Sequence, residues 1–286
     1  MPVLALALSL TSNLDDAQVR RNIAVRFLKS AGHSNLSTTA KIHTVETAPK
    51  GEKYQYTHFE NNEATLGVEH FTNSVSHYFD SRGDVYTHRG APRVKTVQEA
   101  IQIALLWCKQ TGVKLPARFA GTSPALPKAE VARVQGGFTT EYSVEFRDVV
   151  KGYPAPGGNF AVIQVGAFVG RVTNFSGKSG VTYNSPITLI GKARAVDTAK
   201  AEFVKSAGSY KLKPTEIPKF EVNRFGFHTS STRGADPLFR NLFFDRKARL
   251  SYNVLGTFPG KGWPRQCSLL IDAETGKLLS EIAYWK

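Results

Sequence analysis

A helical period of apolar residues is clearest in residues 96–112, TVQEAIQIALLWCKQTG. The apolar side chains recur there at i, i+3, i+4 and i+7, a spacing that places them on one face of a helix. This pattern predicts an amphipathic helix that packs against a core. Its apolar face consists of Ala100, Ile103, Ala104 and Trp107.

Both ends of this segment carry signals for helix termini. Thr96 is a good N-cap residue, and Glu99 stands three positions later, where it completes a capping box. Gly112 follows the last apolar residue, and glycine readily adopts the left-handed conformation that ends many helices. The sequence therefore predicts a helix that begins after Thr96 and stops at Gly112.

The ending of this helix occurs three times along the chain, with the pattern aromatic-x-Lys-x-x-Gly. We expect a helix before each copy, the first starting near Asp15 or Asp16 and the third near Asp197. The aromatic residues are expected in the core and the lysines in a last turn, where a cation suits the helix dipole. The copies are FLKSAG at 27–32, WCKQTG at 107–112 and FVKSAG at 203–208.

A β-hairpin pattern follows each predicted helix. Apolar and polar residues alternate there, which is typical of half-buried strands. Gly or Asn stands at the shared turn position, and both residues tolerate the positive φ of a tight turn. The hairpins span 68–75, 165–172 and 271–278, with Asn73, Gly170 and Gly276 at the turn.

Another strand is predicted before each hairpin, marked by a tyrosine two residues before an apolar or aromatic residue. In the second and third copies, a loop of the form Gly-aromatic-Pro comes next. The strands are 53–59, 141–146 and 251–258, and the loops are GYPAPGG at 152–158 and GKGWPRQ at 260–266.

These elements predict an α+β fold of three repeats, each a helix packed on an antiparallel sheet, because that packing buries the apolar face of both. The first repeat is divergent, and the third carries an irregular insertion. The boundaries are 1–12 for a leader or truncated signal peptide, then 13–95, 96–186 and 187–286 for the repeats, with the insertion at 209–248.

The helix, Tyr-x-Val strand and apolar-Asp-Ala-x-Thr-Gly hairpin resemble the PepSY domain. The resemblance is best at 251–285, fair at 139–175 and weak at 53–80, where His70 and Asn73 replace the Ala and Gly of the other copies. It implies a cystatin-like fold, a secreted or cell-envelope location in a bacterium, and inhibition or regulation of a peptidase. It carries over no catalytic residue.

Charge suggests a second class of function. The chain has 37 Lys+Arg and 23 Asp+Glu, a net charge of +14, and residues 187–286 hold 17 basic and 9 acidic side chains. A basic region attracts polyanions, here wall polymer, anionic lipid or nucleic acid. The alternative is a basic, well-solvated surface without such a partner.

The N-terminus and the cysteines each leave two interpretations open. The apolar run from Val3 to Leu10 is near the length of a secretory leader, although no basic residue precedes it, and the alternative is a first β-strand. It is far too short to span a bilayer. Cys108 and Cys267 either pair in an oxidising compartment or remain two buried free thiols.

Catalytic signals are weak. His58, His70 and His77 could form a metal site, but we favour the alternative that they are solvent-facing strand histidines. Glu141 and Glu145 share a strand face, and we expect that face to be solvated. The sequence thus predicts no enzyme, no catalytic residue, no cofactor and no metal.

The Gly-aromatic-Pro loops are the best candidates for binding, because exposed aromatic rings beside cations can hold a ligand. The alternative is that both rings fold back onto their own sheets. We therefore predict a non-catalytic, extracytoplasmic binding protein with a protein partner, which the resemblance implies to be a peptidase. The loop residues are Tyr153 and Lys151 in one loop and Trp263, Lys261 and Arg265 in the other.

Overall fold

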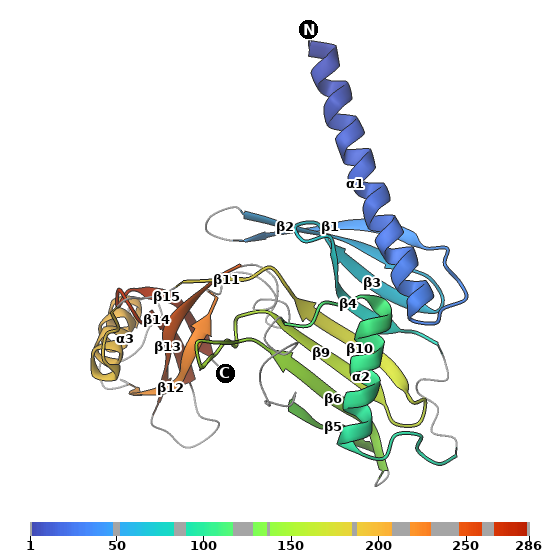
Figure 1. Ribbon diagram of the computed structural model, residues 1–286. Helices are drawn as coiled ribbons and strands as arrows, with labels where there is room; N and C mark the ends of the chain where they lie inside the picture. Colours follow the sequence, from blue (N-terminus) through green and yellow to red (C-terminus); the bar gives the residue numbers. More distant parts are fainter. Residues whose placement is uncertain are drawn as a thin grey trace. The chain divides into compact units, whose positions relative to one another are not determined.

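The computed structural model divides the chain into two compact units, each described below by itself (Figure 1). Unit 1 comprises Met1–Glu46, Lys53–Phe146 and Phe160–Ser179, and unit 2 comprises Thr47–Glu52, Arg147–Asn159 and Gly180–Lys286. The structure describes residues 2–47, 52–82, 90–116, 128–135, 138–184, 188–207, 218–229, 246–258 and 266–284.

Unit 1 is built on an eight-stranded antiparallel sheet of strand order β1-β2-β3-β4-β10-β9-β6-β5. Its helices are α1 (Pro2–Ser30) and α2 (Val97–Thr111). Its strands are β1 (Thr39–Thr47), β2 (Glu52–Glu60), β3 (Ala64–Glu69), β4 (Ser74–Asp80), β5 (Lys128–Gln135), β6 (Phe138–Arg147), β9 (Phe160–Gly166) and β10 (Arg171–Lys178).

Unit 2 holds a five-stranded sheet in the order β11-β13-β14-β15, with β12 also paired to β13, and a two-stranded ribbon of β7 and β8. Its helix is α3 (Lys192–Ala207). Its strands are β7 (Val149–Val150), β8 (Tyr153–Pro154), β11 (Thr182–Tyr183), β12 (Lys219–His228), β13 (Lys247–Thr257), β14 (Gln266–Asp272) and β15 (Leu278–Tyr284).

The predicted fold class, three repeats of a helix on its own antiparallel sheet, is wrong. Strands dominate the described part of the chain, and one continuous eight-stranded sheet holds the first two groups of strands. The cause is the antiparallel pairing of β4 with β10, which joins two sheet edges. An edge strand has unpaired N–H and C=O groups, and pairing two edges satisfies both rows.

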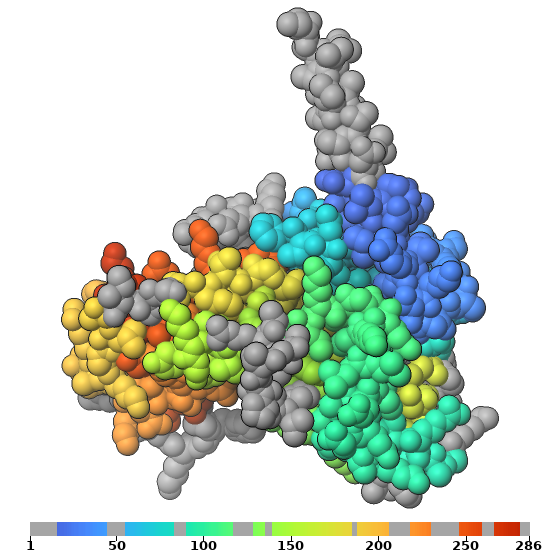
Figure 2. All heavy atoms as spheres, viewed as in Figure 1, coloured from blue at the N-terminus to red at the C-terminus, as the bar shows by residue number. Residues whose placement is uncertain are grey.

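The core of unit 1 lies between this sheet and its two helices, which pack on the same face (Figure 1). Figure 2 shows the described end of α1 beside α2 at the surface. The Trp107 ring of α2 lies 5.5 Å from Phe27 of α1 and 5.6 Å from Phe175 of β10, measured between ring centroids. The aromatic residues of the first two helix endings therefore share one core, as the prediction of core positions requires.

Two of the three predicted helix ends are confirmed, and the third, Gly208, lies outside the described residues. Thr96 and Glu99 form the capping box, and Gly112 has φ of 73° and donates its N–H to the Cys108 carbonyl. Gly32 has φ of 80°, and the next residue, His33, donates its N–H to the Leu28 carbonyl at 3.0 Å, which is the Schellman arrangement.

Two predicted helix starts are wrong, because both helices begin earlier. α1 begins at Pro2 rather than near Asp15, since Pro is tolerated in a first turn and the Ala- and Leu-rich residues behind it favour a helix. α3 begins at Lys192 rather than near Asp197, and it buries Ala195 before that aspartate. No helix in the described ranges is long and apolar enough to cross a membrane.

The predicted turns and strands are confirmed. The turn residues Asn73, Gly170 and Gly276 have φ of 46°, 67° and 72°. The strands expected at 53–59 and 141–146 lie in β2 and β6, and that expected at 251–258 forms most of β13.

Cys108 and Cys267 are both buried and free, which is the second of the two interpretations. Cys108 belongs to the core of unit 1 and Cys267 to that of unit 2. Burial raises the pKa of the Cys108 thiol to about 12, so it remains protonated at neutral pH and is a poor nucleophile.

Candidate functional site

The eight-stranded sheet has a second face, opposite to α1 and α2, which we call the helix-free face. Side chains alternate along a strand, so the neighbours of a core residue point to the other face. Tyr78 of β4 is a core residue with 1% of its surface exposed, and Phe79 beside it is 38% exposed. His77, on the other side of Tyr78, is half-buried on the same face as Phe79.

Three histidines and a tyrosine gather on this face at the β1 end of the sheet. We call this group the imidazole cluster. It comprises His43 of β1, Tyr56 and His58 of β2, and His77 of β4.

Gly67 of β3 makes the cluster possible. The register pairs His58 with Gly67 and Gly67 with His77, so the glycine lies between the two histidines. A Cβ atom on Gly67 would stand 1.9 Å from Cε1 of His77, which shows that the imidazole occupies the space over the glycine. The His77 and His58 rings therefore stack across β3, with centroids 5.8 Å apart.

The remaining contacts tie the cluster together. His43 stacks on Tyr56 with ring centroids 5.1 Å apart and meets His58 edge-on at 5.7 Å. Tyr56 in turn meets His77 edge-on at 5.4 Å. These ring contacts join four rings on three strands into one contiguous surface. Beside it, Nδ1 of His77 lies 3.2 Å from Oγ of Ser76.

Two histidines of the cluster, His58 and His77, are held in their neutral form. Burial, with the nearby His58 and His43, lowers the pKa of His77 to about 4. Burial and the proximity of His43 also lower the pKa of His58, although Glu60 opposes the shift. Neutral imidazoles are metal ligands, but no group of His, Cys, Asp or Glu in the described ranges is arranged to hold a metal ion.

The structure brings only two of the three histidines of the candidate metal site together. His58 and His77 meet, but Nε2 of His70 bonds Oγ1 of the buried Thr57 at 2.9 Å, and Thr57 alternates with His58 along β2. The third histidine of the imidazole cluster is instead His43, which the sequence analysis did not identify. The signal that could have found it is that His43 and His58 lie on consecutive strands.

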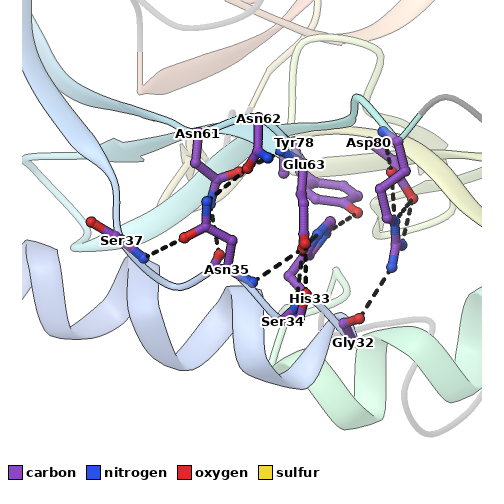
Figure 3. A network of polar contacts seen from close by, with 12 residues as sticks. Gly32, His33, Ser34, Asn35, Ser37, Asn61, Asn62, Glu63, Tyr78 and Asp80 are labelled. Carbon is purple, nitrogen blue, oxygen red and sulfur yellow. Dashed lines mark hydrogen bonds and ion pairs between the residues drawn. The ribbon is translucent and has the colours of Figure 1, made fainter.

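A second polar network surrounds His33 at the end of α1 (Figure 3). Nε2 of His33 lies 2.8 Å from the Tyr78 hydroxyl, and Nδ1 lies 3.2 Å from Oε2 of Glu63. The Ser34 hydroxyl donates to Oε1 of Glu63 at 2.6 Å, and the N–H groups of Ser34 and Asn35 donate to Oε2. The bond from the Ser34 hydroxyl is the largest of several that together lower the pKa of Glu63 to about 2.

Glu63, His33 and Tyr78 are arranged as carboxylate, imidazole and hydroxyl, the order found in catalytic relays. The burial of the hydroxyl shows that the network instead stabilises the fold. The Tyr78 hydroxyl belongs to a residue that is 1% exposed, and burial raises its pKa. Its phenol is therefore neither accessible nor ionised at neutral pH. The contacts instead join the end of α1 to β4 and to Glu63, which precedes β3.

A buried ion pair next to this network spans the seam between β4 and β10. The Asp80 side chain is fully buried and contacts Nη2 of Arg82 at 2.6 Å and Nε of Arg171 at 2.9 Å. Burial alone would raise the pKa of Asp80, but the hydrogen bonds from both arginines outweigh it and leave the pKa below its ordinary value. Arg171 belongs to β10, so this carboxylate links the two halves of the sheet.

Unit 2 has polar groups inside its own sheet. Nδ1 of His228 lies 3.0 Å from Oγ of Ser251, and burial lowers the pKa of His228 to about 4. Ser251 is completely buried, so its hydroxyl is not available to a substrate. Asp272 pairs with Arg249 at 2.5 Å and accepts the N–H of Thr275 at 2.8 Å, which holds the β14–β15 turn.

The structure describes only two of the five residues predicted for binding, Tyr153 and Lys151. Tyr153 lies in β8, is half-buried and packs edge-on against Phe225 at 5.3 Å, as the alternative of folding back onto the sheet describes. Lys151 is exposed, with φ of 50°. Trp263, Lys261 and Arg265 lie outside the described residues.

The predicted acidic pair faces basic residues. Oε1 of Glu141 accepts a hydrogen bond from the Thr173 hydroxyl at 3.0 Å, and its register partner is Arg133. Lys128 is the register partner of Glu145. Both carboxylates therefore have a basic register partner across the strand pair, and both are half-buried rather than fully exposed.

Comparison with known proteins adds only a distant likeness to solved structures. No protein-family model matches the chain, and no curated protein matches its sequence. Among solved structures, the chain is similar to the Bacillus megaterium YpeB C-terminal domain, with a TM-score of 0.37 and 16% identity over 94% of this chain and 97% of that one. A likeness of this strength carries no argument, so the proposals below rest on the residues.

Proposed function

We propose that the protein is a non-catalytic binding protein whose protein partner docks on the helix-free face at the imidazole cluster. The observation that carries the proposal is the cluster itself. Four rings lie in contact on a half-buried surface, and Phe79 on the same face is 38% exposed.

Such a surface suits a protein partner for a physical reason. Aromatic and imidazole rings offer large apolar faces with a few polar atoms at their rims, and burying them loses little side-chain entropy. The low pKa values of His58 and His77 mean that the partner would bury neutral rings at pH 7, without the cost of desolvating charge.

The lack of catalysis is also part of the proposal. The side chains that most resemble catalytic groups, Tyr78 and Ser251, are buried in the two cores. Their hydrogen-bond partners, His33 and His228, have lowered pKa values because they too are buried. These contacts are better explained by stability than by chemistry.

The finer proposal is an extracytoplasmic inhibitor or regulator of a peptidase, and it rests on the PepSY-like residues at 251–285. Inhibition assays of the purified protein against secreted metallopeptidases test it. We expect inhibition at micromolar concentration, weakened at least tenfold by Tyr56→Ala, because truncating an aromatic hot spot at the centre of an interface costs about 2 kcal/mol or more.

The matched control is Lys109→Ala on the exposed side of α2, which should leave inhibition unchanged. Absence of both binding and inhibition at micromolar concentration would remove the peptidase proposal. Binding that Tyr56→Ala does not weaken would place the interface away from the imidazole cluster.

The polyanion alternative stays a prediction. Two of the lysines on α3 already have acidic neighbours, Lys205 with Glu202 at 2.5 Å and Lys200 with Asp197 at 3.9 Å. A titration with wall polymer, anionic lipid or nucleic acid at two salt concentrations tests it, since binding through phosphates weakens as salt rises.

A further inference from the structure

The His77 ring occupies a place that suits an uncharged group. A Cβ atom on Gly67 would lie 1.9 Å from Cε1 of the ring, 2.5 Å from Nδ1 and 2.6 Å from Nε2, so the ring lies flat over the glycine. The His58 ring stacks on it with centroids 5.8 Å apart, and Tyr56 meets it edge-on at 5.4 Å. The ring is therefore packed between the backbone of β3 and two other rings.

The hydrogen bonds of this ring show where an added proton would bind. The Ser76 hydroxyl donates to the Gly67 carbonyl at 3.3 Å, so toward Nδ1 of His77, 3.2 Å away, it can only accept. Neutral His77 thus carries its hydrogen on Nδ1, and an added proton binds Nε2. Within the described part of the chain Nε2 forms no hydrogen bond, so no acceptor there would stabilise that proton.

The charged and titratable groups that face His77 from the neighbouring strands do not neutralise it. By the alternation of side chains, they are Lys41 and His43 of β1, Tyr56, His58 and Glu60 of β2, Glu69 of β3 and Lys178 of β10. Oε2 of Glu60 lies 4.0 Å from Nε2 of His58, and Glu69 accepts the Thr72 hydroxyl at 2.7 Å. No ion pair within the described ranges includes His77.

We propose that His77 is an acid switch of the imidazole cluster, in which the neutral ring stays over Gly67 and the protonated ring rotates away into water, so that the docking surface is lost. A proton on Nε2 places a charge against the His58 ring in a half-buried site without a counter-charge, and such a charge is costly unless it reaches water. The core lies on the other face of the sheet, so the ring can leave while the core stays intact.

The direction and range of the switch follow from proton linkage. The pKa of His77 over Gly67 is about 4, because burial and the nearby His58 and His43 lower it, whereas a ring in water has the ordinary value of 6.5. The displaced ring therefore binds the proton more tightly, and acid favours it. Between pH 7 and pH 4 the ratio of displaced to packed rings should rise about a hundredfold.

NMR of the protein alone tests the movement. We expect a nuclear Overhauser effect between the His77 and Tyr56 rings at pH 7 that disappears between pH 6.5 and 4, while the His77 ring takes up a proton. The contact between Phe27 and Trp107 in the core, with centroids 5.5 Å apart, should persist over the same range and show that the chain is still folded.

Two variants sharpen the test. In Gly67→Ala the new Cβ fills the place of the ring, so the His77–Tyr56 contact should be absent even at pH 7. The control is His70→Gln, which removes a half-buried histidine that bonds Thr57 instead of joining the cluster. It should leave the pH response of the His77–Tyr56 contact unchanged.

Three results would overturn the proposal. His77 could take up a proton while its contact with Tyr56 persists, which would show that the ring is charged in place. The ring contact and the core contact could vanish together, which would mean that acid unfolds the chain and switches nothing. The contact could also survive at pH 7 in Gly67→Ala.

The effect on a partner rests on the proposed function, and the two can fail separately. A ring that moves in a protein that binds no partner at any pH supports the switch and removes the proposed function. A partner that binds equally well at pH 7 and at pH 4, although the ring has moved, would show that the movement does not control docking.

Discussion

Gly67 is the residue on which the candidate site depends. Its lack of a side chain gives His77 the space in which it stacks against His58. In most strands glycine weakens packing, but a glycine can also mark a place where another group approaches closely. Here the approaching group is an imidazole, so one glycine explains both the stacking and the burial of His77.

Gly67→Ala should therefore disrupt the cluster. The new Cβ would stand 1.9 Å from the His77 ring, which must swing away. We expect a loss of about 1–3 kcal/mol in the free energy of unfolding, typical of overpacking, and a rise of the His77 pKa toward its ordinary value. Urea unfolding and NMR titration measure the two effects.

The matched control is Gly191→Ala, because a Cβ there meets nothing within 4 Å. It should change the free energy of unfolding far less. An unchanged His77 pKa in Gly67→Ala would contradict the role given to the glycine.

Buried histidines also make stability depend on pH. The pKa of His77 and of His228 is about 4 in the folded protein, below the ordinary value of 6.5. As pH falls below 6.5, the unfolded chain binds protons first, so stability is full above that value and is lost between pH 6.5 and 4. At pH 5 the loss should be about 2 kcal/mol for each histidine.

Urea unfolding at pH 7 and at pH 5 checks this expectation. In His77→Gln the loss on going to pH 5 should be smaller by the share of His77, about 2 kcal/mol, while His228 and other histidines with lowered pKa values, His33 and His58 among them, still contribute. Equal losses in the native protein and in the variant would show that His77 does not titrate in this way.

At the scale of elements, helix ends and turns followed from local signals. Thr96 and Glu99 cap α2 as their spacing indicates, and Gly32 and Gly112 end their helices with positive φ. These signals are readable because capping bonds and backbone preference act within a few residues. The starts of α1 and α3 were missed because helix-favouring residues lie before the acidic residues chosen as starts.

The seam between β4 and β10 is the element-scale feature that no local signal revealed. Its two strands belong to hairpins far apart in the sequence, and its stability depends on Asp80 with Arg82 and Arg171. In the sequence Asp80 is an ordinary polar residue at the end of a strand. Its burial and its partner Arg171 become visible only when the strands are paired.

Asp80→Ala should be among the most damaging substitutions at this scale. It leaves two arginines beside a buried position without their carboxylate, and breaking such a pair costs about 3–5 kcal/mol. We expect a loss of that order, somewhat reduced by the partial exposure of both arginines, in the free energy of urea unfolding. Amides of β4 and β10 should also exchange faster.

The matched control is Glu130→Ala in the exposed Lys128–Glu130 pair, whose atoms are 3.1 Å apart. Surface pairs contribute about 0–1 kcal/mol, so stability should barely change. Similar losses in both variants would argue against a special role for the seam.

At the scale of the whole molecule, the chain forms two units, each with its own core. Both units bury aromatic residues from the recurring helix endings, Phe27 and Trp107 in one and Phe203 in the other. Both also contain buried histidines that contact hydroxyl groups, His33 with Tyr78 and His228 with Ser251.

The sequence by itself determined the features with a local energetic cause. These are helix stops, turn residues that need positive φ, strand alternation, and aromatic positions that must be buried. The tertiary structure alone decided which strand edges pair and which side chains from distant strands meet on one face. It therefore decided the eight-stranded sheet and the meeting of His43 with His58 and His77. The physical reason is that edge pairing satisfies hydrogen bonds between segments far apart in the chain, and several pairings satisfy them equally well until packing selects one.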